Sequence, residues 1–335
     1  MGKSFKRMYT MIFITGATGH VGNNLVRLLI DKKVEFKLLQ RQSGKALNDL
    51  KVDIVLGDVF DPAFLAREVK QGDIFVHVAA LIDLQNTMPV ESDQINNLGT
   101  KTIIDFCQNN KVKLIYTSSV DCILREKNQK LIAEPDKIIP EAFTSNYASS
   151  KAKATAYLLD KIKHEAMNAV ILYPSAVIGV HDYKPSAAGI EMQKSLKRRI
   201  FFYIQGGYNF IDVTDCAKAI YACIEKSVTG NYILSGYNCT LKEFYKEICS
   251  VQNHKAIFMP LPAFFAKAFV FLIPRFSKVM VDAVLDNYHY DNRRMRQDLL
   301  ENLTPFEVTV KNTISWFIQN PQQKNVYEVN PILGT

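Results

Sequence analysis

The chain has 335 residues, which is more than one ordinary hydrophobic core accommodates, so we expect either one large unit with an appended lobe or two interleaved domains. Hydrophobic residues make up 48% of it, which excludes a disordered chain. The net charge of +8 is compatible with an anionic ligand, but the basic residues are mostly scattered. We interpret the two basic runs, 194–199 and 293–296, as solvated helix faces.

The cysteines and the apolar tracts bear on whether the protein binds a metal and whether it spans a membrane. The six cysteines form no C-x-x-C pair and have no histidine cluster, so we expect no metal site and reduced thiols in a cytoplasmic protein. The longest apolar tract, Ala256–Pro274, is interrupted by two prolines and a lysine, which argues against a membrane-spanning helix. An amphipathic helix around Ala263–Ile273 is expected to pack in a second lobe, with a membrane-surface role as the alternative.

Short apolar runs alternate with helical patterns through the first half. In chain order they predict a strand at 11–15, a helix at 19–31, strands at 36–40 and 53–56, a helix opened by Asp61-Pro62, a strand at 74–78, a long helix at 89–109, a strand at 112–117, a helix from 143 to 165 and a strand at 170–173. Such alternation predicts an α/β fold of Rossmann type, with a doubly wound parallel sheet covered on both faces.

Beyond Pro174 the alternation becomes irregular. One more strand is expected at 232–234 and a helix at 240–251, and residues 256–335 have a helix-rich pattern. We therefore expect a dinucleotide-binding Rossmann domain over 1–175, with 205–235 returning to it. Residues 176–204 and 236–335 would form a smaller, helix-rich substrate lobe.

A glycine turn joins the first strand to the first helix. Gly16 permits a tight turn beside a pyrophosphate, Gly19 opens a helix whose free N–H groups and dipole attract phosphate, and Gly22 lets that helix pack closely. The spacing is G-x-x-G-x-x-G, which differs from the better-known G-x-G-x-x-G. The turn predicts a dinucleotide site to which Thr18, His20 and Val21 also contribute.

The end of the second predicted strand bears on the choice of cofactor. In an NAD site an acidic residue near this point bonds the adenosine ribose, but Gln40 stands here and Arg41 follows. Arg41 suits a 2′-phosphate, which favours NADP over NAD, whereas a plain surface arginine is the alternative. Further expected cofactor contacts follow the third and fourth strands: Asp58, which bonds the adenine amine or caps the next turn, Val59, and the small residues Val78, Ala79 and Ala80.

Three side chains suit proton transfer at a carbonyl oxygen. Tyr147 and Lys151 are four residues apart and share one helix face. An ammonium beside a phenol favours the phenolate, so Lys151 is expected to lower the pKa of Tyr147 and to hold the nicotinamide ribose. Ser119 follows the fifth strand, at the sheet edge where ligands bind in open α/β folds, and is placed to hold the oxygen on which charge develops.

Together these residues resemble the extended branch of the short-chain dehydrogenase/reductase superfamily, which includes epimerases, dihydroflavonol reductases and 3β-hydroxysteroid dehydrogenases. The matching motifs are Thr15–Gly22, Gly57-Asp58, His77–Ala80, Asn96–Thr100, Thr117–Ser119, Tyr147 with Lys151, Pro174–Gly179 and Phe210–Asp215. The resemblance implies that Ser119, Tyr147 and Lys151 form a catalytic triad and that Asn96 supports a water near the lysine. It also implies cofactor contacts from Thr117, Ser118, Tyr173, Pro174 and Ser175.

Departures from the family pattern discriminate within it. Sugar-nucleotide dehydratases carry Thr-Asp-Glu where this chain has Ser119-Val120-Asp121, and valine cannot replace the acid. We therefore expect an NADP(H)-dependent oxidoreductase that interconverts a carbonyl and an alcohol on a small organic substrate. A sugar-nucleotide epimerase that retains NAD(P), with a nucleotide diphosphate held by basic residues at 194–199, is the first alternative, and a non-catalytic dinucleotide-sensing protein is the second. No nucleic-acid partner is expected, and a homodimer is possible.

Overall fold

The computed structural model of the chain describes residues 10–42, 44–83, 85–125, 129, 131–262, 281 and 284–321, so the helix expected around 263–273 lies outside the described residues. The chain folds into two compact units. The first comprises residues 1–124, 134–173 and 217–232, and the second comprises 125–133, 174–216 and 233–335. The segment 205–235 was expected to return to the Rossmann domain. Residues 217–232 do so, whereas 205–216 and 233–235 belong to the second unit.

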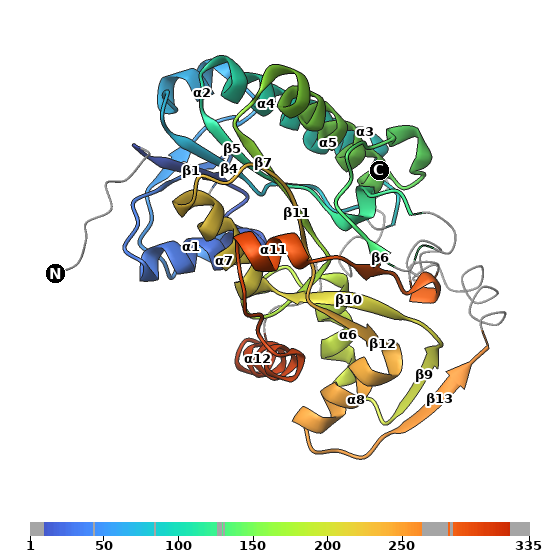
Figure 1. Cartoon of the computed structure of the whole chain (residues 1–335). Coiled ribbons are helices and arrows are strands. Elements are labelled where there is room, and N and C mark those ends of the chain that lie inside the picture. Colours follow the sequence, from blue (N-terminus) through green and yellow to red (C-terminus); the bar gives the residue numbers. More distant parts are fainter. Residues whose placement is uncertain are drawn as a thin grey trace, which may run out of the picture. The chain divides into compact units, whose positions relative to one another are not determined.

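A seven-stranded, mostly parallel sheet forms the centre of the first unit (Figure 1). Its spatial order is β11 (Gly230–Leu234), β7 (Ala169–Pro174), β5 (Lys113–Thr117), β4 (Ile74–His77), β1 (Ile12–Thr15), β2 (Lys37–Gln40) and β3 (Ile54–Leu56). The central strands β1, β4 and β7 are buried along their whole length, because helices cover both faces of the sheet. The strand order reverses at β1, and the predicted doubly wound α/β fold is confirmed.

Helices lie on both faces of this sheet (Figure 1). One face carries α1 (His20–Asp31) and α7 (Val213–Glu225), and the other carries α2 (Pro62–Glu68), α4 (Thr100–Asn109) and α5 (Asn146–Glu165). As predicted, Asp61 caps α2, because its carboxylate accepts a hydrogen bond of 2.9 Å from the Ala63 amide. The long helix expected over 89–109 is found as α3 (Pro89–Ser92), a π-helical stretch Asp93–Gly99 and α4. Such wide turns inside helices are frequent at functional sites.

The second unit contains more strands than the sequence pattern predicted. A three-stranded sheet has the order β12 (Tyr237–Thr240), β10 (Gly207–Asp212) and β8 (Ala176–Ile178), and two pairs are formed by β13 (Ile257–Leu261) with β9 (Ile200–Ile204) and by β14 (His289–Tyr290) with β6 (Leu131–Ile132). Its described helices are α6 (Ala187–Ser195), α8 (Leu241–Val251), α11 (Arg293–Asp298) and α12 (Phe306–Gln319). Its described helices still cover more residues than its strands, and the short strands are the part that the sequence pattern did not predict.

Aromatic rings dominate the core of the second unit. Phe210 of β10 stacks on Phe244 of α8, with ring centroids 5.0 Å apart and planes inclined by 8°. Phe201 of β9 packs on Tyr245 with centroids 4.7 Å apart. Helix α8 is fixed at its start by a capping box between Thr240 and Glu243. This core depends on contacts between distant segments rather than on a repeating local pattern.

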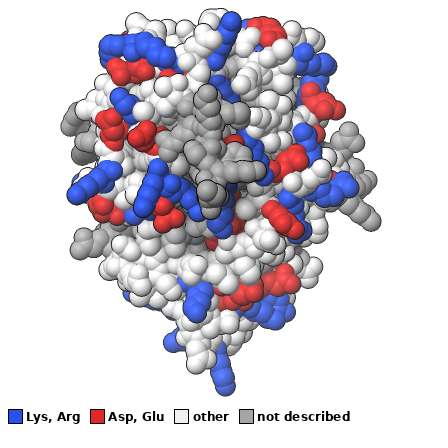
Figure 2. Space-filling model, turned by 60° about the vertical axis from the view of Figure 1, so that its left-hand side comes forward, with Lys and Arg blue, Asp and Glu red and all other residues white. Residues whose placement is uncertain are grey.

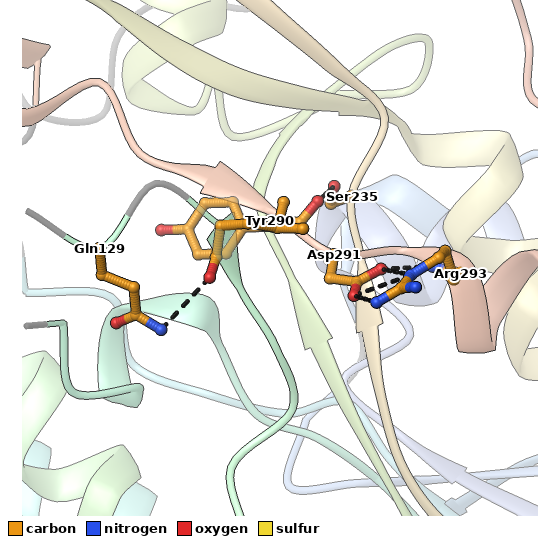
Figure 3. Close-up of polar contacts among 6 residues, drawn as sticks. Gln129, Ser235, Tyr290, Asp291 and Arg293 are labelled. Atoms are coloured by element: carbon orange, nitrogen blue, oxygen red, sulfur yellow. Dashed lines mark hydrogen bonds and ion pairs between the residues drawn. The ribbon is translucent and has the colours of Figure 1, made fainter.

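Two distant segments of the second unit meet at β6 and β14 (Figure 3). Asp291 and Arg293 form an ion pair with an Nη2–Oδ2 distance of 2.6 Å, and Ser235 Oγ donates to the Tyr290 carbonyl at 3.4 Å. The Gln129 amide donates to the Leu131 carbonyl at 3.3 Å. The Arg293 side chain is 84% exposed, as expected for the start of a solvated basic run. The strand pairing thus joins residues 131–132 to residues 289–290 within the second unit.

Surface charge and thiols are distributed as the composition suggested. Figure 2 shows basic and acidic side chains intermixed on the face that it presents. All six cysteines are buried as free thiols. Within the described part of the chain, no helix has the length and apolar character needed to cross a membrane.

Candidate active site

The glycine turn between β1 and α1 is packed so closely that side chains are excluded. Gly16 has φ +81°, and a Cβ there would lie 2.4 Å from the Ala79 amide nitrogen at the end of β4. A Cβ on Gly22 would lie 2.2 Å from the Gly16 carbonyl oxygen. Gly19 is the N-cap of α1, and neither a side-chain cap nor an acidic residue occupies the first turn of this helix. The helix start is therefore suited to a phosphate, because the N-cap residue supplies no side-chain acceptor for the free N–H groups.

The segment that follows β2 lies against this turn. A Cβ on Gly44 would lie 2.5 Å from the Thr18 methyl group, which shows how closely the two segments approach. Arg41 is exposed, and no ion pair of its guanidinium is found among the described residues. The Gln40 side chain is 7% exposed, and both polar atoms of its amide lack a hydrogen-bond partner in the described structure. A buried amide without partners fits a polar ligand at this strand end, because such groups are costly to leave unpaired.

Candidate contacts after β3 and β4 lie at the ends of neighbouring strands. The Asp58 carboxylate accepts a hydrogen bond of 3.0 Å from the Phe60 amide, so it caps its own turn, and a contact to adenine stays a prediction. Val59 is buried beside it. After β4, Val78 and Ala79 are half-buried and Ala80 is exposed. The small residues after β4 leave backbone accessible at the same sheet edge as the glycine turn.

Lys151 lies in the second turn of α5, which Ser145 caps by accepting a hydrogen bond of 3.1 Å from Ala148. The Lys151 side chain is 1% exposed, and its Nζ donates to the Thr117 carbonyl at 2.8 Å. The ammonium also lies 4.8 Å from the centre of the Tyr116 ring. Burial lowers the pKa of Lys151 to about 8. The end of β5 therefore holds a cation whose remaining N–H groups are suited to hydroxyl ligands.

Ser119, Tyr147 and Asp121 form a connected group at the end of β5. Ser119 Oγ donates to the Asp121 carboxylate at 3.2 Å and accepts from the Asp121 amide at 3.2 Å. Burial raises the pKa of Tyr147 and the Asp121 charge raises it further, whereas a hydrogen bond with Ser119 lowers it. The structure thus brings Ser119 and Tyr147 together, as the sequence predicted.

The sign of the Tyr147 shift differs from the sequence-based expectation of a lowered pKa. Burial is the largest influence on the Tyr147 phenol and raises its pKa. Nζ of Lys151 is directed at the Thr117 carbonyl and the Tyr116 ring rather than at this phenol. Asp121 was not expected in this group except as part of the departure from the dehydratase pattern. Its acidic side chain two residues after Ser119 was the available signal.

Asn96 lies in the π-helical stretch and is fully buried. Its amide nitrogen donates to the Leu81 carbonyl at 2.8 Å and to Ser150 Oγ at 3.1 Å, and its oxygen accepts from the Leu81 amide at 2.8 Å. These bonds join the segment after β4 to α5, next to Lys151. In this structure Asn96 is a positioning residue, and its contact to a water near the lysine stays a prediction.

His77 at the end of β4 links three elements, a role that the sequence did not reveal. One ring nitrogen is 2.7 Å from Thr15 Oγ1 on β1, and the other is 3.1 Å from Thr100 Oγ1 on α4. Burial, and then the charge of Lys151, lower the pKa of His77 to about 3, so the ring is neutral. His77 therefore fixes the strand ends beneath the site without adding charge.

Not every predicted cofactor contact has its side chain available. Ser118 Oγ is 2.7 Å from Thr155 Oγ1, so it faces the packing of α5 on the sheet, and Tyr173 is fully buried in β7. In contrast, the hydroxyl groups of Thr117 and Ser175 are buried and have no hydrogen-bond partner among the described residues. Pro174 ends β7 directly before Ser175. Within the first unit, the close glycine turn, the Lys151 ammonium and the Thr117 hydroxyl fit a dinucleotide, which carries hydroxyl and amide groups.

The NAD dependent epimerase/dehydratase family matches residues 12–235. The chain belongs to this family. The family assignment agrees with the glycine turn, the reversed strand order at β1 and the Ser119, Tyr147 and Lys151 group. The protein is therefore an enzyme of the extended short-chain dehydrogenase/reductase type, and the family binds a nicotinamide dinucleotide.

Similar proteins span nearly the whole chain. A putative dihydroflavonol 4-reductase of Synechocystis is 27% identical over 92% of this chain and 95% of its own length, and sterol demethylase protein B of Methylococcus capsulatus is 22% identical over 91% and 97%. Among solved structures, gox2253 has a TM-score of 0.79 at 24% identity and covers 94% of this chain and 99% of its own. The NAD complex of a Bacillus anthracis dTDP-glucose 4,6-dehydratase has a TM-score of 0.72 at 18% identity, covering 93% and 98%. These structures share the fold.

Proposed function

We propose that this enzyme uses NADP(H) to interconvert a carbonyl and an alcohol on a small organic substrate. The observation that carries the proposal is the convergence of Ser119, Tyr147 and Lys151 at the carboxyl end of β5, beside the end of β4 that packs on the glycine turn. Several relatives support the reaction type, since they are named as a dihydroflavonol 4-reductase, a ketoreductase and a 3-beta-hydroxysteroid dehydrogenase.

The three side chains divide the work at the reacting oxygen. When bound, the nicotinamide supplies or accepts the hydride. Tyr147 donates a proton to the carbonyl oxygen in reduction and takes it back in oxidation. Ser119 donates a hydrogen bond to the same oxygen, on which negative charge develops, once its hydroxyl turns from Asp121. The Lys151 ammonium stabilises negative charge at this strand end and is suited to hold a ribose hydroxyl.

Two features weigh against the sugar-nucleotide alternatives, the first against dehydration and the second against a nucleotide diphosphate at Arg198. Val120 is buried and apolar at the position where dehydratases carry an acid, so it cannot protonate a leaving group. Arg198, a candidate for a nucleotide diphosphate, is already engaged, because its guanidinium pairs with Glu191 at 2.7 Å and lies over the Phe201 ring.

Arg41 supports NADP as the cofactor, since it is exposed next to the buried Gln40 and near the glycine turn.

Binding and turnover are tested separately. Fluorescence titration of the purified enzyme with NADPH and NADH measures binding, and the absorbance of the reduced cofactor measures turnover over a panel of ketones, aldehydes and steroid ketones. We expect Tyr147→Phe to lower kcat by about 10²- to 10⁴-fold with unchanged cofactor affinity. Tyr157→Phe is the matched control, because Tyr157 is on the same helix but bonds Asp105 at 2.6 Å.

The outcomes separate the alternatives. A cofactor that co-purifies, with conversion of a sugar nucleotide and no net absorbance change, would identify an epimerase. Cofactor binding without turnover of any substrate would favour a dinucleotide-sensing protein. Equal losses in the Tyr147 and Tyr157 variants would contradict the role assigned to Tyr147.

A further inference from the structure

The two-stranded sheet of β9 and β13 has one covered face and one open face. The strands pair in parallel, so that Ile200 stands opposite Ile257 and Phe202 opposite Met259. Side chains alternate between the faces of a sheet, and the residues between these pairs, Phe201 and Phe258, point inward with ring centroids 5.5 Å apart. Figure 1 shows β9 and β13 side by side at one end of the second unit.

The open face is apolar. Ile200, Phe202, Ile257 and Met259 have exposures between 46% and 60%, although each belongs to a residue type that is usually buried. Because they form two directly opposed pairs, their side chains make one continuous patch rather than scattered contacts. Contiguous exposed apolar patches of this kind mark interaction surfaces.

The exposed charged residues that directly precede the two strands are all basic. Lys197 and Arg199 precede β9, Lys255 precedes β13, and all three are exposed. The Arg199 carbonyl accepts a hydrogen bond of 2.9 Å from the Ile257 amide, which brings the two cationic strand starts together. The sequence contains no aspartate or glutamate from Met192 to Ile211 or from Ser250 to Val281, whereas the whole chain has 33 of them for 41 lysines and arginines.

The chain between β13 and Val281 continues the same composition. Residues 263–280 include five phenylalanines, together with Lys267, Arg275 and Lys278 and no acidic residue. The described chain on either side of them is fixed at the far end of this sheet, where Leu261, Val281 and Val284 pack on Ile204. This stretch is therefore mostly apolar, all of its charged residues are basic, and the described residues that flank it lie against the end of the β9–β13 sheet.

We propose that the open face of β9 and β13, with its cationic margin, docks on the surface of an anionic lipid bilayer. Interfacial binding needs apolar side chains that enter the headgroup region and cations that pair with anionic lipids, and this face offers both. A second copy of the chain fits less well. Four side chains fall short of the roughly 800 Å² per partner that stable interfaces bury, and a two-fold contact would oppose like charges.

Sedimentation with vesicles tests the proposal, independently of any enzymatic activity. The full chain is mixed with vesicles of phosphatidylcholine, with or without phosphatidylserine at about a third of the lipid. We expect binding to the anionic vesicles that weakens as salt rises, and little binding to the neutral ones. Arg199→Glu with Lys255→Glu should lower the partition coefficient by at least about thirtyfold, and Phe202→Ser with Met259→Ser by about tenfold or more.

A matched variant keeps the test specific. Ile318→Ser with Lys311→Glu alters an apolar and a basic residue that are both exposed on α12, and its binding should equal that of the unaltered protein. Thermal melts verify that each variant is folded. Equal binding by all variants, or no binding to anionic vesicles, overturns the proposal.

A thiol placed in the patch reports on what covers it. Because all six native cysteines are buried, Ile257→Cys supplies the accessible thiol for an environment-sensitive dye. We expect fast labelling in solution and a blue shift of the dye emission on anionic vesicles. A thiol that is protected before vesicles are added would show that residues 263–280 or a second copy cover the face, and it would overturn the proposal.

Discussion

The two units differ in the kind of side chain that each of them buries. The first unit buries polar and charged groups, such as Lys151, His77 and Asn96, and pairs each of them at a strand end. The second unit buries stacked rings, among them Phe201 and Phe244. Buried polar groups give directed chemistry but must be paired, whereas aromatic packing gives stability without chemistry. Changes in the first unit should therefore affect catalysis and cofactor binding, and changes in the second should affect stability.

The largest stability effect is expected in the aromatic core. Phe244→Ala removes a ring that stacks on Phe210, and it should lower the free energy of unfolding by about 3–5 kcal/mol, because it leaves a cavity. Urea denaturation followed by circular dichroism measures this. NADPH affinity should not change while the protein is folded, and a large loss of affinity would contradict the division of roles between the units.

The largest binding effect is expected in the glycine turn. A methyl group at Gly16 would overlap the Ala79 backbone, and φ +81° is unfavourable for alanine, so Gly16→Ala should weaken NADPH binding by at least about 100-fold. Calorimetric titration measures the affinity. Gly72→Ala is the control, because Gly72 also has positive φ but a Cβ there would have only one neighbour, 3.8 Å away. Similar losses of affinity in both variants would point to strain rather than to overlap at the turn.

A smaller effect is expected at the end of β2. If Arg41 pairs with the 2′-phosphate, Arg41→Ala should weaken NADPH binding by about 10- to 100-fold and leave NADH binding almost unchanged. Arg67→Ala is a suitable control, since Arg67 is exposed on α2 and pairs with its neighbour Glu68. Equal losses for the two cofactors would show that Arg41 does not read the phosphate.

The smallest effect is a shift of the pH profile. Reduction needs protonated Tyr147, so kcat falls as pH rises through the pKa of that phenol. The charge of Asp121 raises this pKa, and therefore Asp121→Asn should move the fall to lower pH. Asp105→Asn, which alters a carboxylate bonded to Tyr157, should leave the profile in place. An unchanged profile in the Asp121 variant would separate the measured pH dependence from Tyr147.

The sequence pattern was most informative where function depends on short spacings. The turn from Gly16 to Gly22 and the pair Tyr147 and Lys151 lie within single strand–helix junctions, so spacing alone located them. The strands β8, β9, β10 and β12 were missed because they pair with distant segments, and their short runs have no regular βα rhythm. The π-helical stretch that carries Asn96 was also beyond a reading based on helical periodicity.

The amino-acid sequence by itself determined the family, the order of strands and helices in the first unit, and the residue types gathered for the reaction. Only the tertiary structure determined the hydrogen bonds, the burial and the pKa values of those residues. It aimed Lys151 at the Thr117 carbonyl, set Asp121 beside Ser119, and raised rather than lowered the pKa of Tyr147. The physical reason is that spacing along a chain specifies which groups can meet, whereas burial and the direction of each hydrogen bond specify their charge and strength.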